Sequence, residues 1–248
     1  MHYELLIFFF IIAFTYASVG FGGGSSYLAL LSVYAMPFQE MKLTALVCNI
    51  IVVTGGTIIF VRRKELPLRK ILPLVLASVP MAYIGARLKV SEHTFFVVLG
   101  ICLIIAGALL WIKPLQSVTE VTTEKGDAAK EVVTGGSIGF LSGMVGIGGG
   151  IFLAPVLNLM RWDSPKKIAA TAGFFILINS IAGIAGQLSS LPASVNYTQI
   201  GLLAIAVLAG GQLGSRTGAA KFSQLAVRRV TAVLVTAAGI EVLLKHLY

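Results

Sequence analysis

Long runs of apolar residues, each close to the length that crosses a bilayer, constrain this chain more than any other feature. Runs such as 43–61, 71–88 and 94–112 come near the roughly 20 residues that a membrane-spanning helix needs. Of the 248 residues, 57% are hydrophobic and only 12% are charged. Because a soluble domain carries about 25% charged residues, this composition excludes a soluble catalytic domain. The sequence predicts an all-α polytopic membrane protein.

Two of the apolar segments are too long for one plain span. The eight segments are 4–35, 43–61, 71–88, 94–112, 132–160, 168–188, 199–217 and 230–247. A glycine cluster of the form Gly-x-Gly-Gly-Gly interrupts the first and the fifth near the middle, at 20–24 and 146–150. Glycine runs break helices because they carry the largest backbone entropy cost and permit positive φ. We therefore expect each long segment to form a hairpin of two short helices.

The sequence indicates an internal duplication. The two glycine clusters lie 126 residues apart, and Gly85-Ala86-Arg87 corresponds to Gly214-Ser215-Arg216 at an offset of 129. The spacing of the polar pairs between these motifs differs, so the alignment of the second spans stays open. The predicted units are a first transmembrane repeat at 1–112, a polar linker loop at 113–131 and a second transmembrane repeat at 132–248.

The distribution of basic residues separates two topologies. Eight plain crossings would place 9 of the 19 Lys and Arg residues on one side and 10 on the other. If both glycine-broken segments turn back, the division becomes 15 against 4. Because Lys and Arg collect in cytoplasmic loops, the hairpin topology is favoured.

A hairpin plus three spans gives an odd number of crossings, so the second repeat is predicted to be inverted relative to the first. Inverted repeats with broken helices around a midplane site are typical of secondary transporters. The alternative is that the glycines only allow close helix packing, as in the pairs Gly139/Gly143 and Gly210/Gly214.

Two helices that begin inside the membrane would form an anion site from neutral groups. Their first N–H groups lack partners, and the positive end of each helix dipole faces the ligand. No Asp, Glu or His lies in the middle of a segment, which favours an anionic substrate. The predicted binding residues at the two helix starts are Gly22, Gly23, Gly24, Ser25, Ser26, Gly148, Gly149, Gly150 and Ile151.

Polar side chains within the following spans are further candidates for substrate binding. Asn49, Thr171 and Asn179 lie in the spans that follow the glycine hairpins. For each of them, hydrogen bonding between helices is the alternative to ligand binding. Arg87 and Arg216 lie at segment ends, where they either extend to the headgroups or act in gating or anion attraction.

The motifs resemble a known family. Residues 139–155, which carry Gly146-Ile147-Gly148-Gly149-Gly150 at their centre, and the stretch 167–172 are similar to the sulfite exporter TauE/SafE family of membrane permeases. The resemblance covers nearly the whole chain. It implies transport of a small sulfur-containing anion, such as sulfite or an organosulfonate, across a prokaryotic inner membrane.

Other functions remain as alternatives. An anion channel, or a transporter of another small anionic metabolite, would use the same site, whereas a purely structural subunit would tolerate side chains at the glycines. An intramembrane enzyme is not expected, because it needs placed acid–base groups or metal ligands within the spans. We expect the lipid bilayer and a small anion as partners, no cofactor and no nucleic acid, and leave a homo-oligomer open.

Overall fold

The computed structural model describes residues 3–18, 20–34, 36–111, 128–191, 195–221 and 224–247, and its regular structure in these ranges is helical. The first half contains α1 (Glu4–Ala17), α2 (Gly24–Val33), α3 (Phe38–Arg62), α4 (Leu68–Arg87) and α5 (Glu92–Trp111). The second contains α6 (Ala128–Val145), α7 (Gly150–Leu159), α8 (Pro165–Gln187), a short 3₁₀ turn (Leu188–Ser190), α9 (Tyr197–Lys221) and α10 (Gln224–Leu247).

Both predicted glycine breaks are confirmed. The first long segment forms α1 and α2, the fifth forms α6 and α7, and the second helix of each hairpin begins at the last glycine of its cluster, Gly24 or Gly150. Residues 128–131 of the predicted polar linker belong to the first turn of α6, and residues 113–127 lie outside the described residues.

The lengths of the helices fit a membrane protein. Among the described residues, five helices are long and apolar enough to cross a bilayer, at Phe38–Arg62, Leu68–Arg87, Glu92–Trp111, Lys166–Gln187 and Tyr197–Arg216. The apolar helices α1, α2 and α7 are shorter. Short helices beside full-length ones are what broken segments produce, because neither arm of a hairpin needs to cross the whole bilayer.

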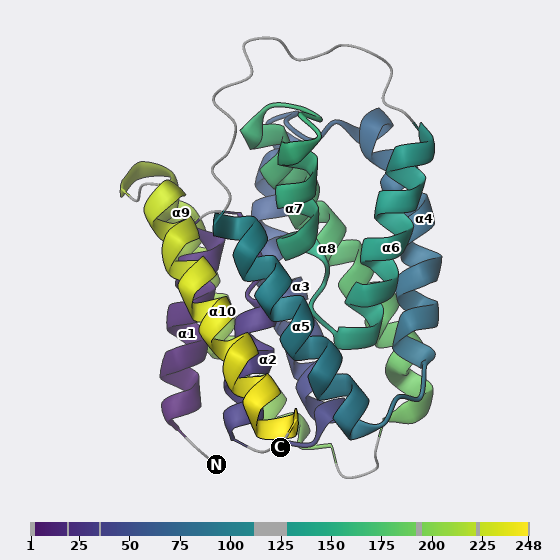
Figure 1. Ribbon diagram of the computed structural model, residues 1–248. Coiled ribbons are helices and arrows are strands. Elements are labelled where there is room, and N and C mark those ends of the chain that lie inside the picture. Colours follow the sequence, from purple (N-terminus) through teal and green to yellow (C-terminus); the bar gives the residue numbers. More distant parts are fainter. Residues whose placement is uncertain are drawn as a thin grey trace.

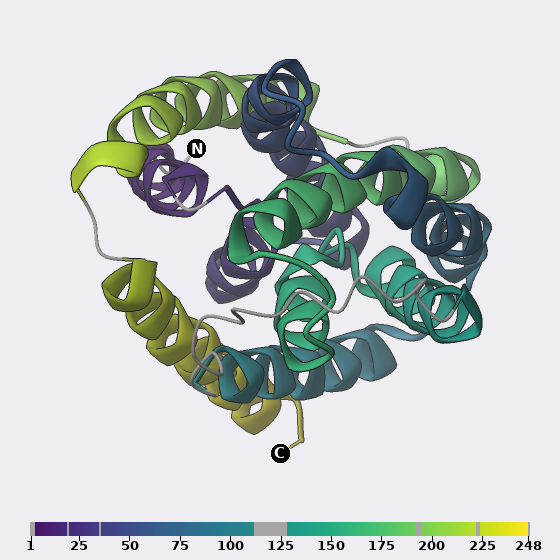
Figure 2. The same cartoon turned by 90° about the horizontal axis from the view of Figure 1, so that it is seen from above.

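Each half packs mainly against the other half (Figures 1 and 2). Helix α1 pairs with α9, and its counterpart α6 pairs with α4. The counterparts α5 and α10 pair with each other, as do α3 and α8. Seen from above, the short helices α2 and α7 lie in the middle of the molecule near α8, and the pairs α1–α9, α4–α6 and α5–α10 lie around them.

Glycine contacts fix the directions of the paired helices. Positions 135, 139 and 143 of α6 meet positions 74, 78 and 82 of α4 in the same order, so these helices run parallel. Glycines 210 and 214 of α9 meet residues 10 and 14 of α1 in the same way. Helices α5 and α10 run antiparallel, because Gly100 faces Leu243 and Gly107 faces Thr236. Antiparallel packing of corresponding helices is the arrangement expected of oppositely oriented halves, and the inverted orientation of the two repeats in a bilayer stays a prediction.

Charged groups at the ends of helices and in a turn connect α4, α8 and the α7–α8 turn at one end of the bundle. Asp163 lies in the turn between α7 and α8 and accepts a hydrogen bond from the Ser164 N–H (2.8 Å). Its carboxylate also forms ion pairs with Lys70 (3.2 Å) and Lys167 (3.3 Å). Desolvation acts to raise the pKa of this carboxyl group, but the hydrogen bond and the lysines together hold it below its ordinary value. The indole N–H of Trp162 donates to the carboxylate of Glu131 on α6 (2.7 Å).

Candidate functional site

The two short helices begin inside the protein with uncapped N-termini. Gly24 and Gly150 are buried. The N-cap residues are Gly23 and Gly149, which have no side chain that could accept a hydrogen bond from the first turn. In α7 the Phe152 N–H bonds to the Gly149 carbonyl oxygen (3.1 Å). N–H groups that stay free in the first turn of a helix, together with the positive end of its dipole, favour an anion.

Asn49 of α3 connects the two glycine clusters. Its Nδ2 donates a hydrogen bond to the carbonyl oxygen of Ile147, 2.9 Å away, and the side chain is fully buried. A Cβ atom placed on Gly22 would lie 2.6 Å from Asn49 Oδ1, and one placed on Gly148 would lie 2.8 Å from Nδ2. Oδ1 makes no hydrogen bond with any described residue. A buried amide thus lies between both loops with an unsatisfied acceptor, which is a costly state unless a ligand or water pairs with it.

Ile176 of α8 occupies the corresponding position in the second half. A Cβ atom on Gly22 would lie 3.3 Å from Ile176 Cγ2, and one on Gly148 would lie 2.9 Å from the same atom. Ile176 also lies directly against Gly150, as Asn49 lies against Gly24. The counterpart of Asn49 is therefore Ile176, which settles the alignment that the sequence left open. One wall of the site is polar and the opposite wall is apolar.

Asn179 of α8, the candidate binding residue of the second half, has hydrogen-bond partners outside the glycine loops. Its Nδ2 donates to Ser78 Oγ of α4 (3.1 Å) and to the Phe175 carbonyl oxygen (2.8 Å). The first bond connects α8 to α4, and the second lies within α8, one turn earlier. The donor group of Asn179 therefore serves helix packing, while its Oδ1 has no partner among the described residues.

The hydroxyl groups at the first-half loop differ in their surroundings. Ser25 is almost fully buried at the start of α2, and Ser26 Oγ lies 2.7 Å from the hydroxyl of Tyr16 on α1.

Two further candidates belong to the second half. Thr171 of α8 is fully buried, and its Oγ1 has no partner in the described part of the chain. Ile151, at the start of α7, is half-buried.

Sequence reasoning did not identify Ser180 and Ser142, which border the second glycine cluster. Ser180 Oγ would lie 3.1 Å from a Cβ on Gly148, and Ser142 Cβ would lie 3.2 Å from one on Gly149. Both hydroxyl oxygens are buried without a hydrogen-bond partner among the described residues. Ser180 directly follows Asn179, so one residue of helical rotation decides which of them faces the loop.

The two loops have different backbone conformations. In the second cluster Gly146, Gly148 and Gly149 have φ between +81° and +85°, whereas in the first only Gly20 has a positive φ among the described residues. An L-residue with a side chain rarely adopts such φ values. The second loop therefore requires glycine at these positions for the backbone itself, in addition to the close approach of α3 and α8.

Arg87 and Arg216 are exposed at the ends of the bundle. Arg87 donates to the hydroxyl of Tyr83 one turn earlier (3.2 Å) and lies over its ring. Arg216 lies within α9, which continues to Lys221. No described contact joins either guanidinium group to the glycine clusters, so the structure gives them positions at the periphery.

Because the apolar segment 43–61 begins directly after it, the sequence places Lys42 in a loop, and that prediction is wrong. It lies in the second turn of α3, is 4% exposed, and packs its aliphatic stem against the backbone of Gly146. Sequence reasoning placed it outside because the apolar run begins at Leu43.

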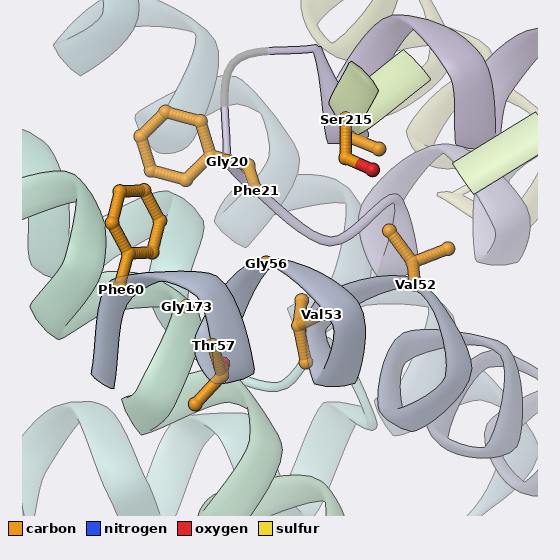
Figure 3. A pocket seen from close by; sticks show the side chains of 10 residues that line it. Gly20, Phe21, Val52, Val53, Gly56, Thr57, Phe60, Gly173 and Ser215 are labelled. Carbon is orange, nitrogen blue, oxygen red and sulfur yellow. The ribbon is translucent and has the colours of Figure 1, made fainter. Parts of the chain in front are cut away.

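A small cavity lies beside the first loop (Figure 3). Its lining includes Gly20, Val53, Gly56, Thr57 and Gly173, and it has room for about one water molecule. A Cβ on Gly56 would meet nothing within 4 Å, whereas the corresponding Gly183 faces Leu46 at 3.2 Å. The packing is therefore looser at Gly56 than at the corresponding Gly183.

Comparisons with known proteins agree with this architecture. The family model described as sulfite exporter TauE/SafE matches residues 5–242. The chain is 32% identical over 241 residues to the probable membrane transporter protein y4hK of Sinorhizobium fredii, covering 96% of this chain and 97% of that protein. It is 26% identical over 261 residues to the probable membrane transporter protein YunE of Bacillus subtilis, covering 94% and 93%.

No solved structure matches the chain. The family match spans both glycine-broken hairpins and the helices that follow them. The chain therefore belongs to the sulfite exporter TauE/SafE family of membrane transporters.

Proposed function

We propose that this membrane transporter is a secondary permease for a small sulfur-containing anion, such as sulfite or an organosulfonate, in a prokaryotic inner membrane. The anion would bind near the midplane between the starts of α2 and α7. The observation that carries the proposal is the position of Asn49, buried between both glycine loops with an unsatisfied Oδ1.

The chemistry of this region suits an anion. Two uncapped helix N-termini offer N–H donors and positive dipole ends. The side chains that approach the glycine clusters there include Asn49, Ser180 and Ile176, none of which is acidic. A site without carboxylates does not repel a negatively charged ligand.

The packing of the two halves supports alternating access. Corresponding helices pair antiparallel, as α5 and α10 do, which is the arrangement of an inverted repeat. In such transporters one repeat rocks against the other around a fixed site.

The sulfur-containing substrate comes from the family description, which names a sulfite exporter. The two relatives named above are described only as probable membrane transporters. Sulfite, thiosulfate and a small sulfonate are therefore the probes of choice, with chloride as a non-sulfur anion.

Reconstituted full-length protein tests the proposal. We expect saturable uptake of radiolabelled sulfite or sulfonate into proteoliposomes, with stimulation by unlabelled substrate on the opposite side. Gly148→Ala should reduce uptake at least tenfold, because the new Cβ approaches Asn49 Nδ2 and Ile176 at a strained φ. Absence of saturable flux in the unaltered protein would refute transport of these anions. Flux without trans-stimulation would favour a channel.

A further inference from the structure

Lys42 is a buried cation next to the glycine loop of the proposed site. It is 4% exposed and lies in α3, within a helix that is long and apolar enough to span the membrane. In the described part of the chain it makes no hydrogen bond or ion pair, and its one recorded charge contact is to the Phe95 ring, 6.0 Å from Nζ. A buried charge without a partner is expensive, so such residues inside membrane proteins mark functional sites.

The nearest acidic residue in sequence does not neutralise this cation. Glu40 is also buried, but it lies two residues earlier, about 200° around the helix, where side chains do not meet. No ion pair joins Glu40 to Lys42 in the described structure. Glu40 instead lies in the first turn of α3, where a negative charge is favoured by the helix dipole.

Lys42 faces the same loop as Asn49. The two residues are seven positions apart, which places them on one face of α3 about 10 Å apart along the axis. A Cβ on Gly146 would lie 3.2 Å from both Cβ and Cγ of Lys42, while Asn49 bonds to the next residue, Ile147. One face of α3 therefore lies along the second glycine loop: the stem of Lys42 packs at Gly146 and its Nζ extends toward the Phe95 ring, while the Asn49 amide bonds to Ile147.

The first glycine loop has no such cation at the equivalent position. Gly20 corresponds to Gly146, and a Cβ on Gly20 would lie 3.9 Å from Cβ of Ala169 on α8. Ala169 thus takes the place that Lys42 has in the other half. The charge is an asymmetric feature added to an otherwise repeated framework.

We propose that Lys42 is the positive charge that draws the anion onto the second glycine loop and sets its affinity. This inference rests on the proposed function, since it assigns the counter-charge of the same substrate. The anion enters from the end of the molecule where α3 begins, meets Lys42 first, and moves along the loop toward Asn49.

Concentration-dependent sulfite uptake in proteoliposomes tests the role of Lys42. Lys42→Met keeps the aliphatic stem and removes the charge, so the half-saturating concentration should rise about tenfold or more. Lys42→Arg keeps the charge and should stay within about threefold of the unaltered protein. Lys89→Met is the control, because Lys89 is an exposed lysine just beyond α4, at the end where α3 begins.

Thermal unfolding distinguishes a binding role from a structural one. Removing an unpaired buried charge should leave the unfolding temperature equal or higher. The sulfite-induced increase in that temperature should shrink in Lys42→Met only. An unchanged half-saturating concentration in Lys42→Met, or a lowered unfolding temperature without sulfite, overturns the inference. Failure of the unaltered protein to transport any probe refutes the proposed function instead.

Discussion

The side-chain amide of Asn49, in the first half of the chain, donates a hydrogen bond to the backbone carbonyl of Ile147, in the glycine loop of the second half, across 98 positions of sequence. This bond fixes the orientation of the amide, because only Nδ2 can face a carbonyl oxygen. Oδ1 must then point away, toward Gly22 of the first loop. A single side chain therefore holds the two broken helices in register.

Replacing Asn49 with Ala should affect both stability and transport. The Ile147 carbonyl loses its donor, which costs about 1–3 kcal/mol in the free energy of unfolding when a buried group is left unpaired. We also expect sulfite uptake to fall at least tenfold, since the amide lies between both loops. Asn158→Ala is the control, because among the described residues the Asn158 side chain bonds to Ala154 of its own helix and to no other residue. Equal uptake in the two variants would contradict a binding role for Asn49.

Gly24→Ala should destabilise the fold, and Gly56→Ala should not. A Cβ on Gly24 would lie 2.6 Å from the Ile147 carbonyl oxygen and directly against Asn49 Nδ2, so overpacking should cost about 1–3 kcal/mol. A Cβ on Gly56 meets nothing within 4 Å, and Ala in a helix is favoured over Gly by up to about 1 kcal/mol. Thermal unfolding in detergent measures the difference, and the same sign for both variants would show that the close approach at Gly24 is wrong.

Substitutions of the α6 glycines should affect stability differently according to whether the glycine contacts the backbone of α4. Gly139→Ala places a Cβ 2.5 Å from the Ser78 carbonyl oxygen of α4, so we expect a loss of about 1–3 kcal/mol. Gly136→Ala, three residues earlier, places its Cβ at an ordinary 3.8 Å from Met81 Cγ and should be neutral or stabilising. Unfolding temperatures compare the two directly. Neither variant should alter the half-saturating sulfite concentration of the protein that remains folded.

Asp163 should stabilise the bundle at neutral pH and lose that effect in acid. Its pKa in the folded protein lies below the ordinary value, so its contribution is fully present above about pH 4 and disappears as pH falls through the folded pKa. Asp163→Asn should lower the free energy of unfolding at pH 7 by about 1–3 kcal/mol, because the ion pairs to Lys70 and Lys167 are lost. Unfolding measured from pH 7 to pH 3 should show the two proteins converging. A difference that stays constant to pH 3 would contradict the ion-paired carboxylate.

The glycine breaks were predictable because their cause is local. A run such as Gly148-Gly149-Gly150 disfavours helix wherever it occurs, so the hairpins and the starts of α2 and α7 follow from the sequence. Asn49 was also a candidate from the sequence, as a polar residue in an apolar span, and its role in binding stays a prediction. Its partner was not a candidate, because Asn179 matched it in residue type while Ile176 matches it in position.

The faces of the long helices could not be predicted in the same way. In α3 and α8 apolar residues surround the helix on all sides, so no polar stripe shows which residues point inward. Ser180 and Asn179 differ by one position, about 100° of rotation, yet only Ser180 approaches Gly148. The end of an apolar run likewise failed to show that Lys42 is buried.

The sequence by itself determined that this is a helical membrane protein with two glycine-broken hairpins and with few charged residues in its spans. These properties depend on composition and on backbone preferences that act over a few residues. Only the tertiary structure decided which side chains meet at the glycine loops, that Asn49 faces Ile176 across them, and that Lys42 lies against Gly146. Those contacts depend on the rotation and pairing of helices far apart in the chain, and packing between the two halves sets both.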